Sequence, residues 1–204
     1  MKSFTYKDLT IELNSEVYEP AEDTFQLLEA IELNGCEKVF EIGTGSGIIA
    51  LDCCRHGANV VCSDVNPFAV KLARINYKNN ISLMKGSFEV RCGDLFNVLK
   101  KDEVFDIIIF NPPYLPTKKS DLVGGSGWFD IATDGGVDGL RLTSRFIDGL
   151  KKHLSKSGRA YFIFSSLADR NKLEKYLIKK EFKIEILSSL RFNDELLDVY
   201  CIYF

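Results

Sequence analysis

Apolar positions fall into short, β-rich runs that alternate with longer amphipathic segments along the chain. The run Ile107–Phe110 contains no polar residue, which indicates a strand buried on both faces, as in a parallel sheet. The pattern predicts strands at Lys38–Ile42, Asn59–Ser63, Phe88–Cys92, Phe105–Phe110, Arg159–Phe164, Phe182–Ser188 and Leu197–Tyr203. It predicts helices at Ala21–Leu33, Gly47–His56, Pro67–Asn79, Gly139–His153 and Ala168–Lys180.

The last two predicted strands are separated only by the polar segment Leu190–Glu195, which leaves no room for a helix. This spacing is typical of a hairpin, so the two strands are expected to be antiparallel. Helices and strands alternate over the rest of the chain, which predicts a parallel sheet covered by helices on both faces. We therefore expect an α/β fold with a seven-stranded, mostly parallel sheet that ends in an antiparallel hairpin.

Length and composition indicate how many domains the chain forms and where the protein is located. The 204 residues carry 26 basic and 29 acidic side chains, a formal net charge of −3, and 46% of them are hydrophobic. This length and apolar content predict one domain over residues 1–204. No apolar run approaches the about 18 residues of a membrane span, and Met1–Asn14 has no signal-peptide core. We expect a cytoplasmic protein, with the nucleus as a second location and no membrane partner.

The charge balance also bears on nucleic acids. A slightly acidic chain lacks the basic surface that phosphate binding requires, so no direct nucleic-acid partner is expected. No two of the six cysteines have the CxxC spacing of a metal or redox site, which predicts buried free thiols of a reduced compartment. The cysteines are Cys36, Cys53, Cys54, Cys62, Cys92 and Cys201. No metal site is expected.

A glycine-rich turn follows the first strand of the predicted sheet. Glu41, Gly43, Gly45 and Gly47 form the pattern E-x-G-x-G-x-G directly before a predicted helix. Glycines at such a turn let the backbone approach a ligand closely. A dinucleotide site requires a third glycine at position 48, which is isoleucine, so a nicotinamide enzyme is disfavoured. The turn instead resembles the S-adenosyl-L-methionine loop of class I methyltransferases.

Acidic residues follow the next two predicted strands. Asp64 lies about 20 residues beyond the glycine turn, where a carboxylate can accept both hydroxyls of a ribose. Asp94 and Leu95 follow the third strand, and this pair suits the amino group and the ring face of an adenine. Because carboxyl ends of parallel strands meet at one edge of a sheet, these residues are expected to line one cofactor site.

The fourth predicted strand ends in the sequence Asn111-Pro112-Pro113-Tyr114. Two prolines fix the backbone and remove two donors, which leaves free carbonyl groups in a rigid turn. The turn resembles that of methyltransferases acting on planar amide or aromatic-amine nitrogens. The Asn111 side-chain oxygen and the Pro112 carbonyl could accept both N–H hydrogens of such a nitrogen, and Tyr114 could stack on it. Positioning then supplies most of the acceleration, without a strong general base.

Two further segments extend the resemblance to residues 16–203. With Glu41–Gly47 and Asn111–Tyr114, the segments Val17–Thr24 and Gly135–Gly139 resemble the HemK family. This family methylates the glutamine side-chain amide in the Gly-Gly-Gln motif of class 1 translation release factors. Residues 1–16 form a short N-terminal extension in place of a helical domain, as in the eukaryotic and archaeal branch. Membership implies the class I fold and S-adenosyl-L-methionine as the methyl donor.

The resemblance also implies partners and site residues. Members of this branch pair with a small zinc-binding activator protein that several methyltransferases share. By resemblance, the cofactor and amide site is lined by Thr24, Glu41, Gly43, Gly45, Asp64, Asp94, Leu95 and Asn111, with Pro112 and Tyr114 beside the acceptor amide. Some members have been assigned lysine targets, so protein-lysine methylation is a competing hypothesis.

Two further hypotheses concern different classes of protein. An adenine-N6 nucleic-acid methyltransferase shares the Asn111–Tyr114 turn, but it usually needs a target-recognition domain and a basic cleft. A non-enzymatic scaffold would have no use for Glu41, Asp64 and Asn111 together. The glycine-rich segment 115–133 is either a mobile substrate loop or a surface insertion, and the pattern favours neither.

If the strand order is the usual one for this fold, the strand Phe88–Cys92 lies at one edge of the sheet, with Phe88, Val90 and Cys92 on one apolar face. An unprotected edge of this kind can be covered by a strand of a partner. This strand is therefore the expected contact with the activator, and aspartate at Phe88 and Val90 is expected to abolish copurification.

Overall fold

The computed structural model describes residues 2–117, 127–192 and 194–204 of the chain. Its elements follow in the order β1 (Ser3–Tyr6), β2 (Leu9–Glu12), α1 (Glu22–Ala30), β3 (Lys38–Ile42), α2 (Ile48–Arg55), β4 (Asn59–Asp64), α3 (Pro67–Asn79), η1 (Ile81–Leu83), β5 (Phe88–Cys92), η2 (Leu95–Val98), β6 (Phe105–Phe110), α4 (Trp128–Thr133), α5 (Arg141–His153), β7 (Leu154–Ser165), α6 (Arg170–Lys179), β8 (Lys183–Phe192) and β9 (Glu195–Tyr203).

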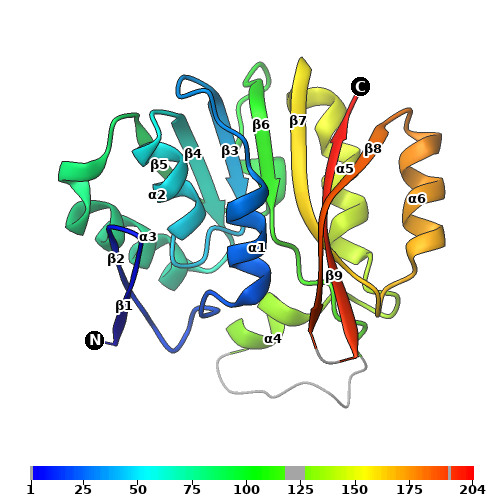
Figure 1. Ribbon diagram of the computed structural model, residues 1–204, viewed down its shortest axis with the longest axis horizontal. Coiled ribbons are helices and arrows are strands. Elements are labelled where there is room, and N and C mark those ends of the chain that lie inside the picture. The colour runs from blue at the N-terminus through cyan, green and yellow to red at the C-terminus, as the bar shows by residue number, and fades with distance from the viewer. Residues whose placement is uncertain (1, 118–126, 193) are drawn as a thin grey trace.

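Seven strands form one sheet in the order β5-β4-β3-β6-β7-β9-β8 (Figure 1). Strands β5, β4, β3, β6 and β7 are parallel, whereas β9 runs antiparallel to both of its neighbours. Apolar residues of α1, α2 and α3 pack on one face of the sheet, and those of α5 and α6 pack on the other. The predicted α/β fold with a C-terminal antiparallel hairpin is confirmed.

Three strands near the C-terminus are longer than predicted: β7 begins at Leu154 and not at Arg159, and β8 and β9 take up most of the segment Leu190–Glu195, which was expected to be a polar loop. The other boundaries mostly agree with the sequence pattern, but two further regions differ. Residues 3–12 form a hairpin inside the segment that we expected to be a mere extension. Its second strand is held by α3: Asn76 bonds the backbone N–H and carbonyl of Glu12, and Asn80 bonds those of Thr10. The second difference is α4, which lies within the predicted loop and is too short to show a helical period.

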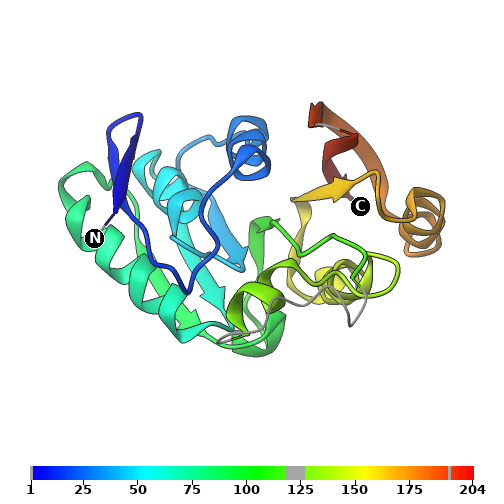
Figure 2. The same cartoon turned by 90° about the horizontal axis from the view of Figure 1, so that it is seen from below.

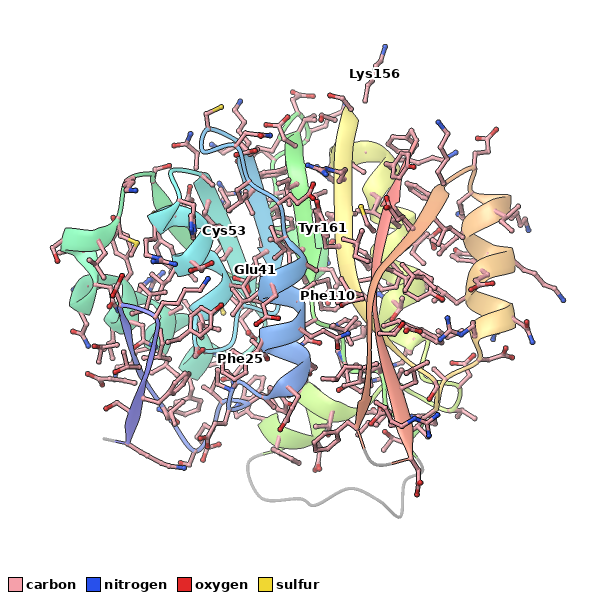
Figure 3. The ribbon with its side chains drawn as sticks, in the orientation of Figure 1. Phe25, Glu41, Cys53, Phe110, Lys156 and Tyr161 are labelled. Atoms are coloured by element: carbon pink, nitrogen blue, oxygen red, sulfur yellow. The ribbon has the colours of Figure 1, made fainter. Side chains whose placement is uncertain are left out.

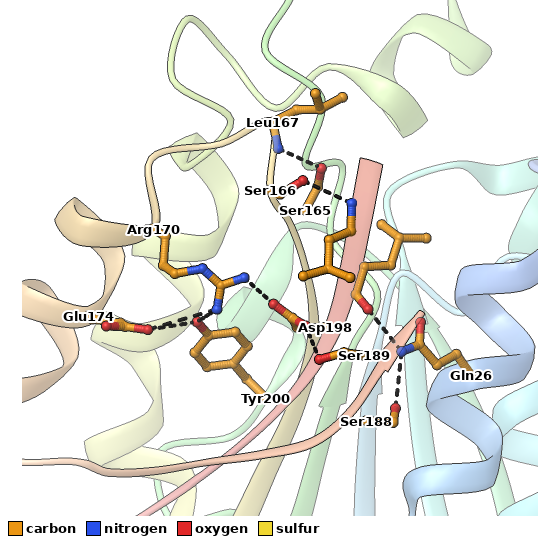
Figure 4. A network of polar contacts seen from close by, with 12 residues as sticks. Gln26, Ser165, Ser166, Leu167, Arg170, Glu174, Ser188, Ser189, Asp198 and Tyr200 are labelled. Atoms are coloured by element: carbon orange, nitrogen blue, oxygen red, sulfur yellow. Dashed lines mark hydrogen bonds and ion pairs between the residues drawn. The ribbon is translucent and has the colours of Figure 1, made fainter. Parts of the chain in front are cut away.

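A polar network fixes the β8–β9 hairpin against the rest of the fold (Figure 4). Asp198, which is fully buried on β9, accepts hydrogen bonds from Arg170 of α6 and Ser189 of β8. On the opposite face, Gln26 of α1 donates to Ser188 and to the Leu197 carbonyl, each at 3.0 Å. Arg170 and Ser189 compensate for the burial of the Asp198 carboxylate. Because these hydrogen bonds form in only one arrangement of the strands, they fix the position of the hairpin.

Four of the six cysteines are buried free thiols, as predicted, but Cys36 and Cys92 are exposed. Cys36 lies in the loop before β3, and Cys92 is the last residue of the edge strand β5, so neither is covered by the layers of the fold. None of the helices in the described parts of the chain is long and apolar enough to cross a membrane.

The predicted edge position of β5 is confirmed, but its apolar face is not free. The Phe88 ring stacks on Tyr77 of α3, with ring centroids 4.5 Å apart, and Val90 is buried in the core. The other face carries an ion pair of Arg91 with Glu103 at 2.7 Å. Phe88 and Val90 are therefore covered by this chain, whereas the exposed Cys92 and the backbone edge of the strand remain accessible to a partner.

Replacing both Phe88 and Val90 with aspartate is expected to lower the free energy of unfolding by about 3 kcal/mol or more, because it places two carboxylates beneath α3. Chemical denaturation of the chain without a partner measures this loss. Glu89→Ala on the solvent side of the same strand is the control and should be nearly neutral. A double variant as stable as the wild type would contradict the packing. Lost copurification of this double variant would thus report unfolding and not a broken interface.

Candidate active site

The main cavity lies at the carboxyl ends of β3, β4 and β6, where the strand order reverses between β3 and β6. Open α/β sheets bind ligands at this switch point, because neighbouring loops diverge there. Glu41 and Phe110 lie on the two adjacent central strands (Figure 3). All ten residues that the sequence assigned to the site, from Thr24 to Tyr114, line this one cavity.

The glycine turn has the conformation that its sequence requires. Gly43, Gly45 and Gly47 have φ values of 67°, 54° and 86°, a region that residues with a Cβ adopt rarely. A Cβ at Gly47 would also stand 3.0 Å from the Cβ of Ala73 on α3. The turn therefore brings the backbone to the cavity wall and packs closely against the next helix.

Glu41 stabilises this turn from inside. Its carboxylate is buried and accepts a hydrogen bond from the Thr44 hydroxyl. Burial raises the pKa of Glu41 to about 8, and the nearby charge of Asp64 acts in the same direction. The side chain lines the cavity and also connects the end of β3 to the glycine turn.

Asp64 joins the glycine turn to the next loop. Its carboxylate accepts the backbone N–H groups of Gly45 and Asn66, both at 2.9 Å, one on each oxygen. Burial raises the pKa of Asp64, and the two backbone hydrogen bonds oppose this shift. A carboxylate has about four acceptor positions, so two remain for hydroxyl groups of a ligand in the cavity.

Asp94 has a partner that the sequence did not predict. Arg145 of α5 reaches both of its oxygens, and the closer contact is 2.5 Å. The predicted contact of Asp94 with an adenine amino group would therefore be shared with a guanidinium. The following residue, Leu95, has a φ of 48°, which is strained for a residue with a side chain and indicates a functional constraint on the backbone.

Asn111 is oriented by a residue that the sequence-based site lacked. Its Nδ2 donates to Oδ2 of Asp23 on α1 at 2.9 Å. Because an ionised carboxylate only accepts, the nitrogen must face Asp23 and the oxygen must face away from it. The Asn111 Oδ1 atom is buried and has no hydrogen-bond partner among the described residues. An unsatisfied buried acceptor is costly, and this one belongs to a side chain that lines the cavity, so a donor group of a bound ligand could satisfy it.

Tyr114 and Thr24 complete the surroundings of Asp23. The Tyr114 hydroxyl donates to Oδ2 of Asp23 at 3.3 Å, and the Thr24 hydroxyl donates to Oδ1 at 3.2 Å. Burial and the charge of Asp23 raise the pKa of Tyr114 well above its usual range, so it stays a phenol. Asp23 lies in the segment Val17–Thr24 that carried the family resemblance, and this was the signal that could have identified it.

The segment Gly135–Gly139 packs against the turn that contains Asn111. The Gly135 N–H donates to the Leu115 carbonyl at 3.0 Å, and a Cβ on Gly139 would stand 2.4 Å from the Tyr114 carbonyl oxygen. Glycine is required because the two backbones are this close. The segment thus supports the Asn111–Tyr114 turn from behind.

The segment 115–133 enters the site at both ends. Leu115 and, from α4, Trp128 and Ile131 line the cavity. Residues 118–126 lie outside the described part of the chain, so the predicted mobile loop stays a prediction.

No group of three or more metal-ligating side chains occurs among the described residues.

Comparison with known proteins identifies the family of the chain. The model of the Methyltransferase small domain family matches residues 22–125. A putative protein N5-glutamine methyltransferase of Methanocaldococcus jannaschii is 40% identical over 186 residues, which cover 90% of this chain and 89% of that protein. The eRF1 methyltransferase catalytic subunit mtq2 of Schizosaccharomyces pombe is 33% identical over 177 residues, or 78% of this chain and 75% of that protein.

A solved structure has the same fold. The chain is similar to a chain of the E. cuniculi Mtq2-Trm112 complex, which is described as responsible for methylation of the eRF1 translation termination factor. The TM-score is 0.68 at 24% identity, and the match covers 92% of this chain and 98% of that chain. At this identity the likeness concerns the fold, which is that of class I methyltransferases.

Proposed function

Because the chain belongs to the HemK family of protein N5-glutamine methyltransferases, we propose that it methylates the glutamine side-chain amide in the Gly-Gly-Gln motif of a class 1 translation release factor. The methyl donor in this proposal is S-adenosyl-L-methionine. A release-factor substrate implies action in the cytoplasm, where translation terminates.

The residues around the cavity suit this donor. The free acceptor positions of Asp64 match the two hydroxyls of a ribose, and the tight turn at Gly43 and Gly45 leaves room for the methionine portion. Asp94 and the strained backbone at Leu95 would hold the adenine. When bound, the sulfonium supplies an electrophilic methyl group. The chain's own task is to place a weak nucleophile in line with it.

The observation that carries the proposal is the free, buried oxygen of Asn111, whose amide nitrogen is held by Asp23. An amide nitrogen is a poor nucleophile, because its lone pair is delocalised into the carbonyl. Asn111 Oδ1 and the Pro112 carbonyl would accept its two N–H hydrogens and fix its orientation. As the N–C bond forms, the nitrogen becomes positive, and these acceptors stabilise the transition state more than the ground state. The leaving proton becomes acidic at the same time, so no strong general base is needed.

The decisive experiment is transfer of a labelled methyl group to a purified class 1 release factor, with a Gly-Gly-Ala version as the matched control. Label in the glutamine protein alone is the expected result. Equal label in both proteins would redirect the substrate to another residue, such as a lysine. Label in an adenine-containing RNA or DNA, and in neither protein, would favour a nucleic-acid methyltransferase.

The small zinc-binding activator belongs to the same proposal. The free backbone edge of β5 is the surface that could accept an added strand from such a partner. The methyl-transfer assay should therefore be run with and without the activator, and copurification of wild-type chain and activator should be measured separately.

Replacing Asp64 with alanine is expected to weaken binding of S-adenosyl-L-methionine by about 10- to 100-fold, because charge-assisted hydrogen bonds to the ribose are lost. The backbone N–H groups of Gly45 and Asn66 also lose their acceptor. Titration calorimetry measures the dissociation constant. Asp52→Asn, which changes a buried acid on α2 outside the cavity, is the control. Unchanged affinity in the Asp64 variant would remove this residue from the ribose site.

A further inference from the structure

Large apolar side chains are exposed at the mouth of the cavity. The apolar rim consists of Leu115, Phe129, Ile131, Val137 and Leu167, which are between 37% and 94% exposed. Val137, the most exposed of them, lies in the segment that supports the Asn111–Tyr114 turn. A group of exposed apolar side chains in one place often marks an interaction site, because burying these side chains against a partner removes them from water and is favourable.

Two of these residues lie at the opening, and the other three belong to segments next to it. Leu115 and Ile131 line the cavity itself, and Leu115 forms a bridge with Asp134 directly after α4. On the other side, a Cβ on Gly139 would stand 2.7 Å from the Cβ of Ala168, which follows Leu167. Figure 1 shows α4 below the sheet, and Figure 2 views the molecule from this end.

Part of the rim is held rigidly. The Leu167 N–H donates to the Ser165 hydroxyl at 3.1 Å, and Ser166 accepts from the Leu196 N–H at 2.8 Å (Figure 4). The Leu167 side chain is nevertheless 51% exposed. A preorganised apolar group costs little entropy on binding, which favours a docking role over random exposure.

Three described cations near the rim are paired with acids. Arg141 contacts Asp134 at 2.8 Å, Lys172 contacts Asp138 at 2.5 Å, and Arg145 contacts Asp94. Phosphate groups need cations that are free to bind them. These three cations are therefore not free for phosphate, and the side chains of the rim itself are apolar, which favours a protein over a nucleic acid.

The site itself cannot distinguish one glutamine from another, because Asn111 and Pro112 would contact only a primary amide. Selection of a single target needs contacts outside the cavity. We propose that the apolar rim docks a folded loop of the protein substrate that presents apolar side chains beside the target glutamine. This inference rests on the proposed function and names the surface that selects the substrate.

The test compares two double variants with the wild type. Phe129→Ser with Val137→Ser removes two rim side chains. Ile81→Ser with Ile178→Ser removes two side chains that are 60% and 66% exposed on η1 and α6, away from the mouth. Binding of the folded release factor is measured by titration calorimetry with S-adenosylhomocysteine present, and kcat/KM is measured with the same factor. The dissociation constant of S-adenosylhomocysteine alone reports whether each variant keeps its fold.

The rim variant is expected to bind the folded factor at least about 10-fold more weakly, as for central interface side chains. Its affinity for S-adenosylhomocysteine and all properties of the control variant should stay unchanged. Equal factor binding by the rim variant and the wild type would overturn the docking role. Weaker RNA binding by the rim variant in a parallel titration, with unchanged binding of the factor, would also overturn it. A wild type that does not bind the factor would overturn it as well. Factor binding without methyl transfer to glutamine would instead contradict the proposed function alone.

Discussion

Replacing Asn111 with alanine is expected to lower kcat for methyl transfer by about 100- to 1,000-fold, the usual loss when one preorganised transition-state contact is removed. The variant loses the buried Oδ1 acceptor that faces the cavity. Binding of S-adenosyl-L-methionine should be nearly unchanged, because Asp64 and the glycine turn remain. Stopped assays of labelled methyl transfer give kcat, and calorimetry gives the dissociation constant.

Asn111→Asp is the informative companion to this variant. It keeps an oxygen at the same position but loses the amide nitrogen that donates to Asp23. Two carboxylates would then face each other, so this substitution should also impair turnover. Normal kcat in the alanine variant would rule out the role of Asn111 as acceptor for the amide. A loss of cofactor binding equal to the loss of turnover would make it a cofactor residue only.

Replacing Asp23 with asparagine is expected to lower kcat by about 10- to 100-fold, because a charge-assisted hydrogen bond is lost. An amide at position 23 can donate as well as accept, so the Asn111 side chain would no longer be held in one orientation. Tyr114 also bonds the same carboxylate oxygen, and its position would loosen. Kinetic assays and cofactor titration distinguish this effect from a general loss of structure.

The neighbouring acid provides a matched control for Asp23. Glu22 lies in the same first turn of α1 but is exposed. Glu22→Gln removes one negative charge from this turn and should leave kcat unchanged. Equal losses in the two variants would mean that the charge of the helix terminus matters, and the specific bond to Asn111 does not.

The strands and helices of the sheet were predictable because their signals are local. The unbroken apolar run Ile107–Phe110 identified a strand with a buried position, and Pro67 after Asn66 identified the first turn of α3. The β1–β2 hairpin was missed although Leu9 and Ile11 alternate with polar residues. Four-residue strands give too short a pattern, and this hairpin depends on Asn76 and Asn80, which lie about 64 to 70 residues further along the chain.

The cover over the apolar face of β5 could not be predicted for a related reason. The alternation of Phe88, Val90 and Cys92 shows that one face is apolar, but it does not show what covers that face. The structure places Tyr77 against Phe88. Edge position and free side chains are separate properties, and only the first can be inferred from strand order.

For this protein, the sequence alone determined the strands of the sheet, ten of the residues that line the cavity and the family, because glycine turns, prolines and strand-end acids act through local backbone geometry. Tertiary structure decided which way those residues face. Asp23 and Asn111 are 88 positions apart, and Asp94 and Arg145 are 51 positions apart. Such pairs form only when packing brings distant elements within hydrogen-bond distance. The orientation of the Asn111 amide, on which the proposed chemistry depends, follows from that packing and not from any local pattern.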